Sequence, residues 1–187
     1  MLHFKQKYDI NIRKNKKIRE KMKRKLLKPC ARFNKITDID AEFLLKKNIK
    51  GLIIDFDNTL VDFKYNEIPK LDKWIKTIKE NNISICIATN STKKGKVEKL
   101  ANSVDIPYIC FSLKPLLFGL KKAKKILNLE SQNIAEIGDQ LFTDVLGANR
   151  LKMYSILTDP IEKKEKNMLN ELKRKLERHI LKKEDNK

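Results

Sequence analysis

Cysteine is scarce in this chain of 187 residues, which has only Cys30, Cys86 and Cys110. The three form no CxxC pair, so the sequence excludes both a disulfide framework and a cysteine-based zinc site. Cys86 and Cys110 lie within apolar runs, which predicts that they pack in the core. This pattern of cysteine usage fits a reducing compartment.

Long apolar runs are also missing. No run approaches the length of about 18 residues that a membrane-spanning helix needs, and residues 1–30 lack the apolar segment of a secretory signal. We therefore expect a cytoplasmic protein, either free or peripheral on the inner face of the membrane. The basic, acid-poor beginning of the chain leaves organellar targeting open as an alternative.

Acidic residues are rare at the N-terminus. Residues 1–33 hold thirteen Lys/Arg and two acids, and the whole chain has a net charge of +19. Residues 1–25 are predicted to form a basic arm that binds anionic lipid or nucleic acid. A solvated tail that only aids solubility is the alternative. Ile18, Met22 and Leu26 recur every four residues, which permits an interfacial amphipathic helix as readily as a disordered arm.

From residue 36 onward, buried strands alternate with helices, and residues 26–187 are expected to form one domain. Continuous apolar strands indicate a parallel sheet covered on both faces, so we expect a three-layer Rossmann-like α/β fold with about five strands. Strands are predicted at 51–56, 84–89, 108–110, 134–137 and 154–157. Helices are predicted at 41–47, from Pro69, and at 93–102, 115–127, 144–151 (N-capped by Thr143) and 163–183. The last helix carries an apolar stripe that should pack on the domain, made of Met168, Leu169, Leu172, Leu176 and Ile180.

Polar side chains follow four of the predicted strands at the point where each strand ends. Ligands of open parallel sheets bind beyond the carboxyl ends of the strands, so these side chains should converge at one edge. Taken by itself, each of these residues has a simpler explanation: a turn that favours Asn or Asp, the end of a strand, or ordinary surface charge. Their shared placement after successive strands favours a functional site. The residues concerned are Asp55, Asp57, Asn58, Thr89, Asn90, Lys114, Asp139 and Asp144.

Carboxylates, a hydroxyl and an ammonium at one edge suit phosphate chemistry. Mg²⁺ prefers oxygen ligands with retained waters, and Asp55, Asp139 and a backbone carbonyl near Asp57 offer three of them. A carboxylate held against Mg²⁺ is a suitable nucleophile for phosphorus, while a second carboxylate serves as general acid and then base. Thr89 offers a hydrogen bond to a phosphoryl oxygen, and Lys114 offers a charge that neutralises the transferring group.

The segments DFDNTL, IATN, LKP and GDQLFTD resemble, in order, the four motifs of the haloacid dehalogenase (HAD) superfamily of phosphotransferases. The chain is most similar to the YqeG subfamily of class IIIA phosphatases, as in KGLIIDFDNTLVDF and EIGDQLFTDVLGANRLKMYSILTDPI. The resemblance covers about residues 26–181 and leaves the first 25 residues outside it. No motif residue is missing, although the motif-two hydroxyl is Thr89 where serine is also common.

This resemblance implies a role for each site residue. Asp55 would be the nucleophile and Asp57 the general acid and base. Mg²⁺ would be held by Asp55, Asp139 and the region of Asp57, while Asp144 would support the metal shell or Lys114. The expected phosphate-binding residues are Asn58, Thr89, Asn90 and Lys114.

Neither the interval 60–89 nor the interval 90–114 has room for a cap domain of the kind that HAD phosphatases of small metabolites often carry. The site should therefore be open and suit a phosphate presented on something large. The YqeG-like group also resembles the mitochondrial-type phosphatidylglycerophosphatases, which act on the way to phosphatidylglycerol and cardiolipin. The expected function is Mg²⁺-dependent hydrolysis of a lipid phosphate, phosphatidylglycerophosphate, through an aspartyl-phosphate, at an anionic membrane. Two alternatives are a phosphatase of nucleotides or nucleic-acid ends, and a binding or assembly protein on a HAD scaffold.

Overall fold

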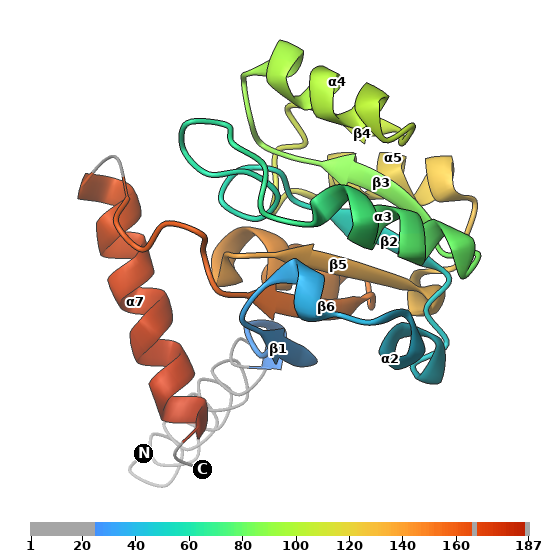
Figure 1. Ribbon diagram of the computed structural model, residues 1–187. Coiled ribbons are helices and arrows are strands. Elements are labelled where there is room, and N and C mark those ends of the chain that lie inside the picture. The colour runs from blue at the N-terminus through green and yellow to red at the C-terminus, as the bar shows by residue number, and fades with distance from the viewer. Residues whose placement is uncertain (1–24, 166–167, 186–187) are drawn as a thin grey trace, which may run out of the picture.

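The computed structural model describes residues 25–165 and 168–185, and the basic arm before Lys25 lies outside the described residues. A six-stranded parallel sheet has the strand order β1-β6-β5-β2-β3-β4 (Figure 1). This confirms the expected α/β class and adds one strand to the expected five, the edge strand β1 that pairs with β6. The strands are β1 (Ala31–Phe33), β2 (Gly51–Ile54), β3 (Ser84–Ala88), β4 (Tyr108–Ile109), β5 (Ile134–Gly138) and β6 (Tyr154–Thr158).

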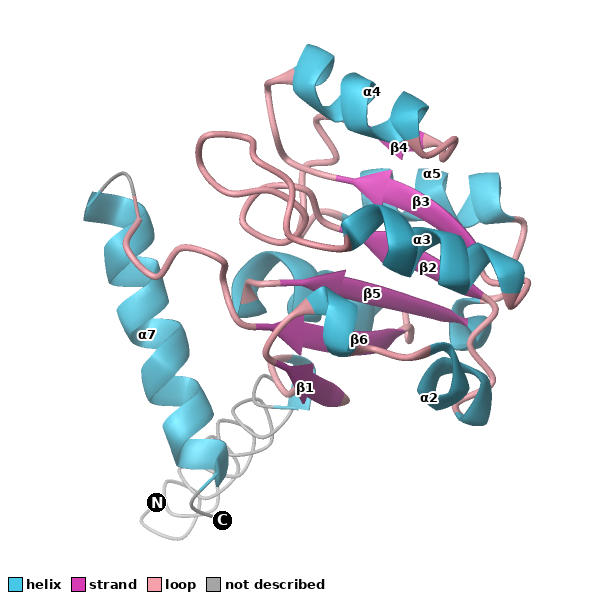
Figure 2. Ribbon diagram, in the orientation of Figure 1, coloured by secondary structure: helices cyan, strands magenta, loops and turns pink. Residues whose placement is uncertain are grey.

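Helices cover both faces of the sheet. Neighbouring residues of a strand point to opposite faces, so one strand contributes side chains to the core on each side. Leu52 and Ile54 of β2 join a core cluster with α2, α3 and α4, while Ile53 joins a second cluster with α5 and α6. Figure 2 shows α2 and α3 in front of the sheet and α5 behind it. The helices are α2 (Ala41–Lys46), α3 (Leu71–Glu80), α4 (Lys94–Ser103), α5 (Leu117–Leu127), α6 (Leu146–Arg150) and α7 (Met168–Asp185), with short turns η1 (Ile36–Asp38), η2 (Ser131–Asn133) and η3 (Leu141–Val145).

The predicted helix start at Thr143 is wrong. Thr143 lies inside η3, a single wide π-turn that begins after Gln140 and leads directly into α6. The amides of Asp144 and Val145 both donate to the Gln140 carbonyl, at 3.1 and 3.3 Å. Such π-turns are often found at functional sites, and this one carries Asp144.

Helix α7 packs on the domain with a different face from the one predicted. Met168, Leu169, Leu172 and Leu176 are all exposed, while Arg174 and Glu177 are buried. Of the predicted stripe only Ile180 packs inward, with Leu181, against a small cluster of Leu141, Val145 and Leu157. No described helix is both long and apolar enough to cross a membrane.

Candidate active site

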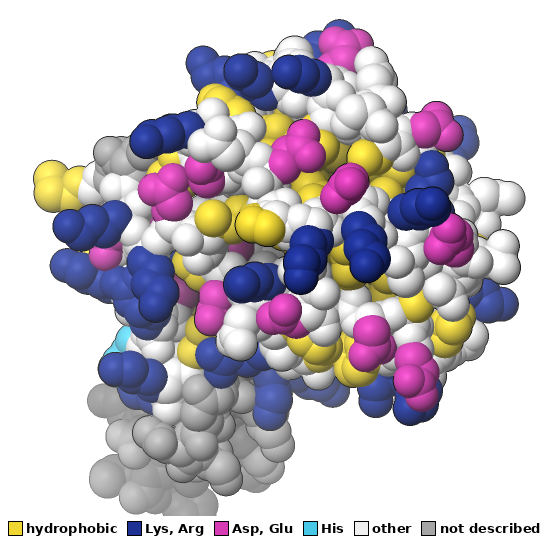
Figure 3. All heavy atoms as spheres, in the orientation of Figure 1, with side chains coloured by type: hydrophobic (Ala, Val, Ile, Leu, Met, Phe, Trp, Pro, Cys, Tyr) yellow, Lys and Arg dark blue, Asp and Glu magenta, His cyan; other side chains and the backbone are white. Residues whose placement is uncertain are grey.

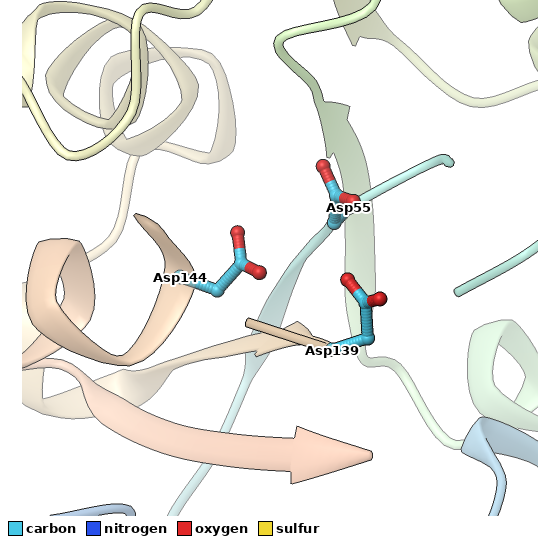
Figure 4. Close-up of side chains that lie close together, drawn as sticks. All are labelled: Asp55, Asp139 and Asp144. Carbon is cyan, nitrogen blue, oxygen red and sulfur yellow. The ribbon is translucent and has the colours of Figure 1, made fainter. Parts of the chain in front are cut away.

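Three buried carboxylates meet at the carboxyl edge of the two central strands. Strands β2 and β5 are paired with Ile54 opposite Ile137, which places Asp55 beyond the end of β2 close to Asp139 beyond the end of β5. Asp144 approaches from η3, and one oxygen from each of the three carboxylates lies within 4.8 Å of the others (Figure 4). Gly138 makes this approach feasible, because a Cβ there would lie 2.3 Å from the carboxyl carbon of Asp144.

Lys114 is the cation among these carboxylates. Its Nζ lies 2.8 Å from Oδ1 of Asp55 and 2.7 Å from Oδ1 of Asp144, and 3.6 Å from Oε1 of Glu136. Burial alone would lower the pKa of Lys114, but Asp144, Asp55 and Glu136 together raise it above its usual value. The lysine therefore stays charged, and one ammonium faces three carboxyl groups.

Burial shifts the pKa of two of these carboxyl groups. Burial raises the pKa of Asp55 from 3.8 to about 6, against the opposing effect of Lys114. Burial likewise raises the pKa of Asp139 from 3.8 to about 8, against the opposing effect of Arg174. An additional cation at this edge would stabilise both ionised forms.

The residues present fit a divalent metal ion. Oδ1 of Asp139 is buried without a hydrogen-bond partner among the described residues, and the three clustered carboxylates offer only oxygen ligands. Mg²⁺ takes oxygen ligands of this kind and usually binds through one or two carboxylates and several waters. Asp55 and Asp139 are therefore suitable ligands, while Asp144 is engaged by Lys114 and by the backbone N–H of Gln140 at 3.0 Å.

Asp57 and Asn58 occupy the turn that follows Asp55. Asp57 is half-buried, outside the carboxylate cluster, and its charge is near enough to add to the effect of burial in raising the pKa of Asp55. Asn58 adopts a left-handed conformation with φ of 62°. Its amide donates to the Glu162 carbonyl at 3.0 Å and accepts from the Glu162 N–H at 2.7 Å, which fixes the turn against residues 161–162. A phosphate contact by Asn58 stays a prediction.

Thr89 and Asn90 follow β3, which pairs with β2 on the side opposite to β5. Thr89 is buried, and its Oγ1 accepts a hydrogen bond from the Ser91 N–H at 3.0 Å. Asn90 holds Lys114 in place, because its Nδ2 donates to the Lys114 carbonyl at 2.9 Å and its Oδ1 accepts from the Lys114 N–H at 2.7 Å. The structure thus gives Asn90 a positioning role, while phosphate contacts by both residues stay predictions.

A model of the mitochondrial PGP phosphatase family matches residues 12–162 of the chain. The chain belongs to this family. The match starts earlier than residue 26, where the motif resemblance was expected to begin. Membership confirms the enzyme class expected from the motifs: the protein is a phosphatase, a phosphoric monoester hydrolase.

Individual relatives agree with the family. The phosphatase is 34% identical over 161 residues to "Probable phosphatase YqeG" of Bacillus subtilis, covering 86% of this chain and 92% of the relative. It is 27% identical over 153 residues to "Phosphatidylglycerophosphate phosphatase 1, chloroplastic/mitochondrial" of Arabidopsis thaliana, covering 77% of this chain and 44% of the relative. An uncharacterized protein from Listeria monocytogenes shares the fold, with a TM-score of 0.52 at 14% identity, over 64% of this chain and 84% of that one.

Two buried charged residues of the phosphatase site were missed from the sequence. Glu136 lies in the middle of β5 and faces Lys114, and burial raises its pKa well above the usual range. An acid inside an otherwise apolar strand was an available signal. Arg174 of α7 binds both the carboxylate and the backbone carbonyl of Asp139, and its Nε donates to Glu165 at 2.7 Å. No local sequence pattern marked Arg174.

Replacing Arg174 by methionine should lower the free energy of unfolding of the phosphatase by about 2–4 kcal/mol, because it leaves buried carboxylates without their cation. The carboxylates that lose this partner are Asp139, Glu165 and Glu177. Urea unfolding at neutral pH measures the change. Arg178→Met is a matched control on the same helix, since Arg178 is exposed and pairs with the partly exposed Glu171 at 3.1 Å. Equal stability of the two variants would contradict the role given to Arg174.

Proposed function

We propose that this phosphatase hydrolyses a phosphate monoester through an aspartyl-phosphate formed on Asp55, with Mg²⁺ as cofactor. The observation that carries the proposal is the contact of Asp55 with Lys114 at 2.8 Å, beside Asp139, at the carboxyl edge of the sheet. The carboxylate can attack phosphorus, while the ammonium beside it neutralises the charge of the phosphoryl group that the carboxylate receives.

The reaction takes two displacements at phosphorus. In the first, an Asp55 oxygen forms a bond to phosphorus, the bond to the substrate oxygen breaks, and Asp57 gives that oxygen its proton. In the second, Asp57 takes a proton from water, the water oxygen bonds to phosphorus, and Asp55 leaves as a carboxylate. Lys114 and Thr89 hold phosphoryl oxygens throughout. Mg²⁺, held by Asp55, Asp139 and a backbone carbonyl near Asp57, would supply positive charge that offsets the repulsion between carboxylate and phosphate.

The substrate we propose is phosphatidylglycerophosphate, the compound in the name of the Arabidopsis relative. The absence of a cap domain between the central strands supports a large substrate. The only helix between β2 and β3 is α3, and the only helix between β3 and β4 is α4, so neither interval holds a domain that would cover the site. The loop that carries Lys114 also has an apolar exterior. The residues of this loop and of the first turn of α5 that are more than half exposed are Phe111 (54%), Leu113 (56%), Leu116 (59%) and Phe118 (70%). An apolar rim beside a phosphate site suits a head group that is attached to acyl chains.

Phosphate release from a panel of substrates tests this assignment. We expect kcat/KM for phosphatidylglycerophosphate in detergent micelles to exceed the values for nucleotides, 5′-phosphorylated oligonucleotides and an aryl phosphate by at least about tenfold. Activity should disappear with EDTA and return with Mg²⁺. A preference for nucleotides or oligonucleotide ends would refute the lipid substrate while leaving the chemistry intact.

A further inference from the structure

Helix α7 turns an apolar face to the solvent. Met168 is 87% exposed, Leu169 80%, Leu172 65% and Leu176 54%. At about 100° per residue these four side chains share one sector of the helix, nearly opposite the buried Arg174 and Glu177. Figure 3 shows hydrophobic side chains projecting at the left edge, where the first turns of α7 lie, with Lys and Arg side chains below them. A row of apolar side chains with this exposure marks an interaction surface.

Basic residues border this apolar stripe. Lys175, Lys182 and Lys183 are exposed on α7, and the whole chain carries +19. A helix with one apolar face and lysines beside it is suited to the boundary between head groups and acyl chains. A second copy of the chain would bring the same large positive charge, so charge complementarity favours an anionic partner. Nucleic acid would match the charge but leave the apolar stripe unused.

The basic arm joins the domain beside the same helix. Leu27 packs in the small cluster that also takes up Ile180 and Leu181 from the last turns of α7. The described part of the chain therefore begins beside the last turns of α7. By sequence, residues 1–33 hold thirteen Lys/Arg and two acids. Lys and Arg side chains close to an anionic membrane are attracted to its surface.

Helix α7 also has a fixed relation to the active site. Figure 2 shows the arrowheads of β3, β5 and β6 pointing toward the side on which α7 lies. Arg174 on its inner face binds Asp139 directly. A surface that binds the outer face of α7 is therefore brought to the same edge of the molecule as the site.

We propose that the outer face of α7 docks on an anionic lipid surface, with Met168, Leu169, Leu172 and Leu176 entering the interface and the neighbouring lysines contacting anionic head groups. This deepens the proposed function, on which it rests for the lipid nature of the substrate. The outer face of α7 would hold the enzyme at the membrane that contains such a substrate.

Sedimentation with vesicles tests the proposal, using phosphatidylcholine vesicles with and without phosphatidylglycerol. The full chain should bind the anionic vesicles and bind much less to phosphatidylcholine alone. The triple variant Leu169→Gln, Leu172→Gln, Leu176→Gln keeps good helix formers at exposed positions and should lose at least about tenfold in vesicle affinity. The matched control Leu45→Gln, Ile126→Gln removes exposed apolar side chains elsewhere, of which Leu45 is 48% and Ile126 43% exposed, and should bind as the parent does.

Turnover of a water-soluble aryl phosphate separates docking from catalysis, because these leucines are exposed on α7 while Arg174 and Glu177 are its buried residues. We expect both variants to hydrolyse it at the parental rate. Equal vesicle binding by the parent and the triple variant, or equal loss in the control, would overturn the proposal. So would a dimer of the parent that the triple variant abolishes in size-exclusion chromatography with light scattering. Failure of the lipid substrate in the panel, with vesicle binding intact, would overturn only the proposed function.

Discussion

Asp55→Asn should reduce phosphate release at least about 10⁴-fold, because removing a covalent nucleophile has costs of this order or more in other enzymes. The carboxamide cannot bond to phosphorus as a carboxylate does. Asp144, the other carboxylate near Lys114 and Asp139, is held by Lys114 and by the backbone N–H of Gln140. Single-turnover assays with labelled substrate should show no covalent phosphoprotein. The control Asp72→Asn changes an exposed acid in the first turn of α3 and should keep full activity. Residual activity near the parental level would show that the nucleophile lies elsewhere.

The same variant should be more stable than the parent in EDTA. Because the pKa of Asp55 is raised from 3.8 to about 6 in the fold, the parent loses stability as the pH rises through this interval. The neutral amide avoids that loss, so the gain should reach about 1–3 kcal/mol above pH 6 and disappear below pH 3.8. Urea unfolding at both ends of this range measures the difference. A variant that is less stable than the parent at neutral pH would contradict the burial cost assigned to Asp55.

The fold followed from the sequence wherever an element carried its own pattern. Strands β2, β3 and β5 were found because each has four or five successive buried residues, which are all apolar apart from Glu136 in β5. Strand β1 was missed because it has three residues with Arg32 in the middle, and only its pairing with β6 makes it a strand. The π-turn η3 was also missed. The prediction of Thr143 as an N-cap assumed an ordinary helix start, whereas Thr143 lies inside the π-turn.

The site was predictable as far as topology determines it. Asp55, Thr89 and Asp139 follow parallel strands of one sheet, so their convergence follows from the strand pattern. The charge balance around them did not follow, because it depends on contacts between residues far apart in the sequence. Glu136 meets Lys114 across 22 positions, and Arg174 meets Asp139 across 35. The stripe of α7 misled for the same reason: the strongest local pattern lay on the face that these distant charge contacts leave exposed.

Lys114→Met should have the largest effect on stability, lowering the free energy of unfolding by about 3–5 kcal/mol at neutral pH. The ammonium is the shared partner of Asp55, Glu136 and Asp144, and its side chain is only 1% exposed. Methionine fills a similar volume, so the decrease in the free energy of unfolding measures the effect of leaving the carboxyl groups without their cation. Activity should be lost together with stability, since in the proposed reaction the same ammonium neutralises the phosphoryl group. The control Lys124→Met removes a lysine that pairs with the mostly exposed Glu130 at 3.0 Å and should change little.

The pH dependence and a second substitution separate charge from packing in this variant. Lys114 lowers the pKa of Asp55 and Glu136 against the effect of burial. Without Lys114 these two groups should take up protons more readily, so the stability deficit of the variant should shrink as the pH falls. Adding Glu136→Gln to Lys114→Met removes one of the unpaired carboxyl groups and should recover part of the lost stability. In the parent the same Glu136→Gln change removes an acid whose pKa is raised well above its usual value. A double-mutant cycle at neutral pH measures the coupling between the two residues. A coupling near zero, with a deficit that does not change with pH, would mean that Lys114 stabilises the site through packing and would remove the electrostatic account of the cluster.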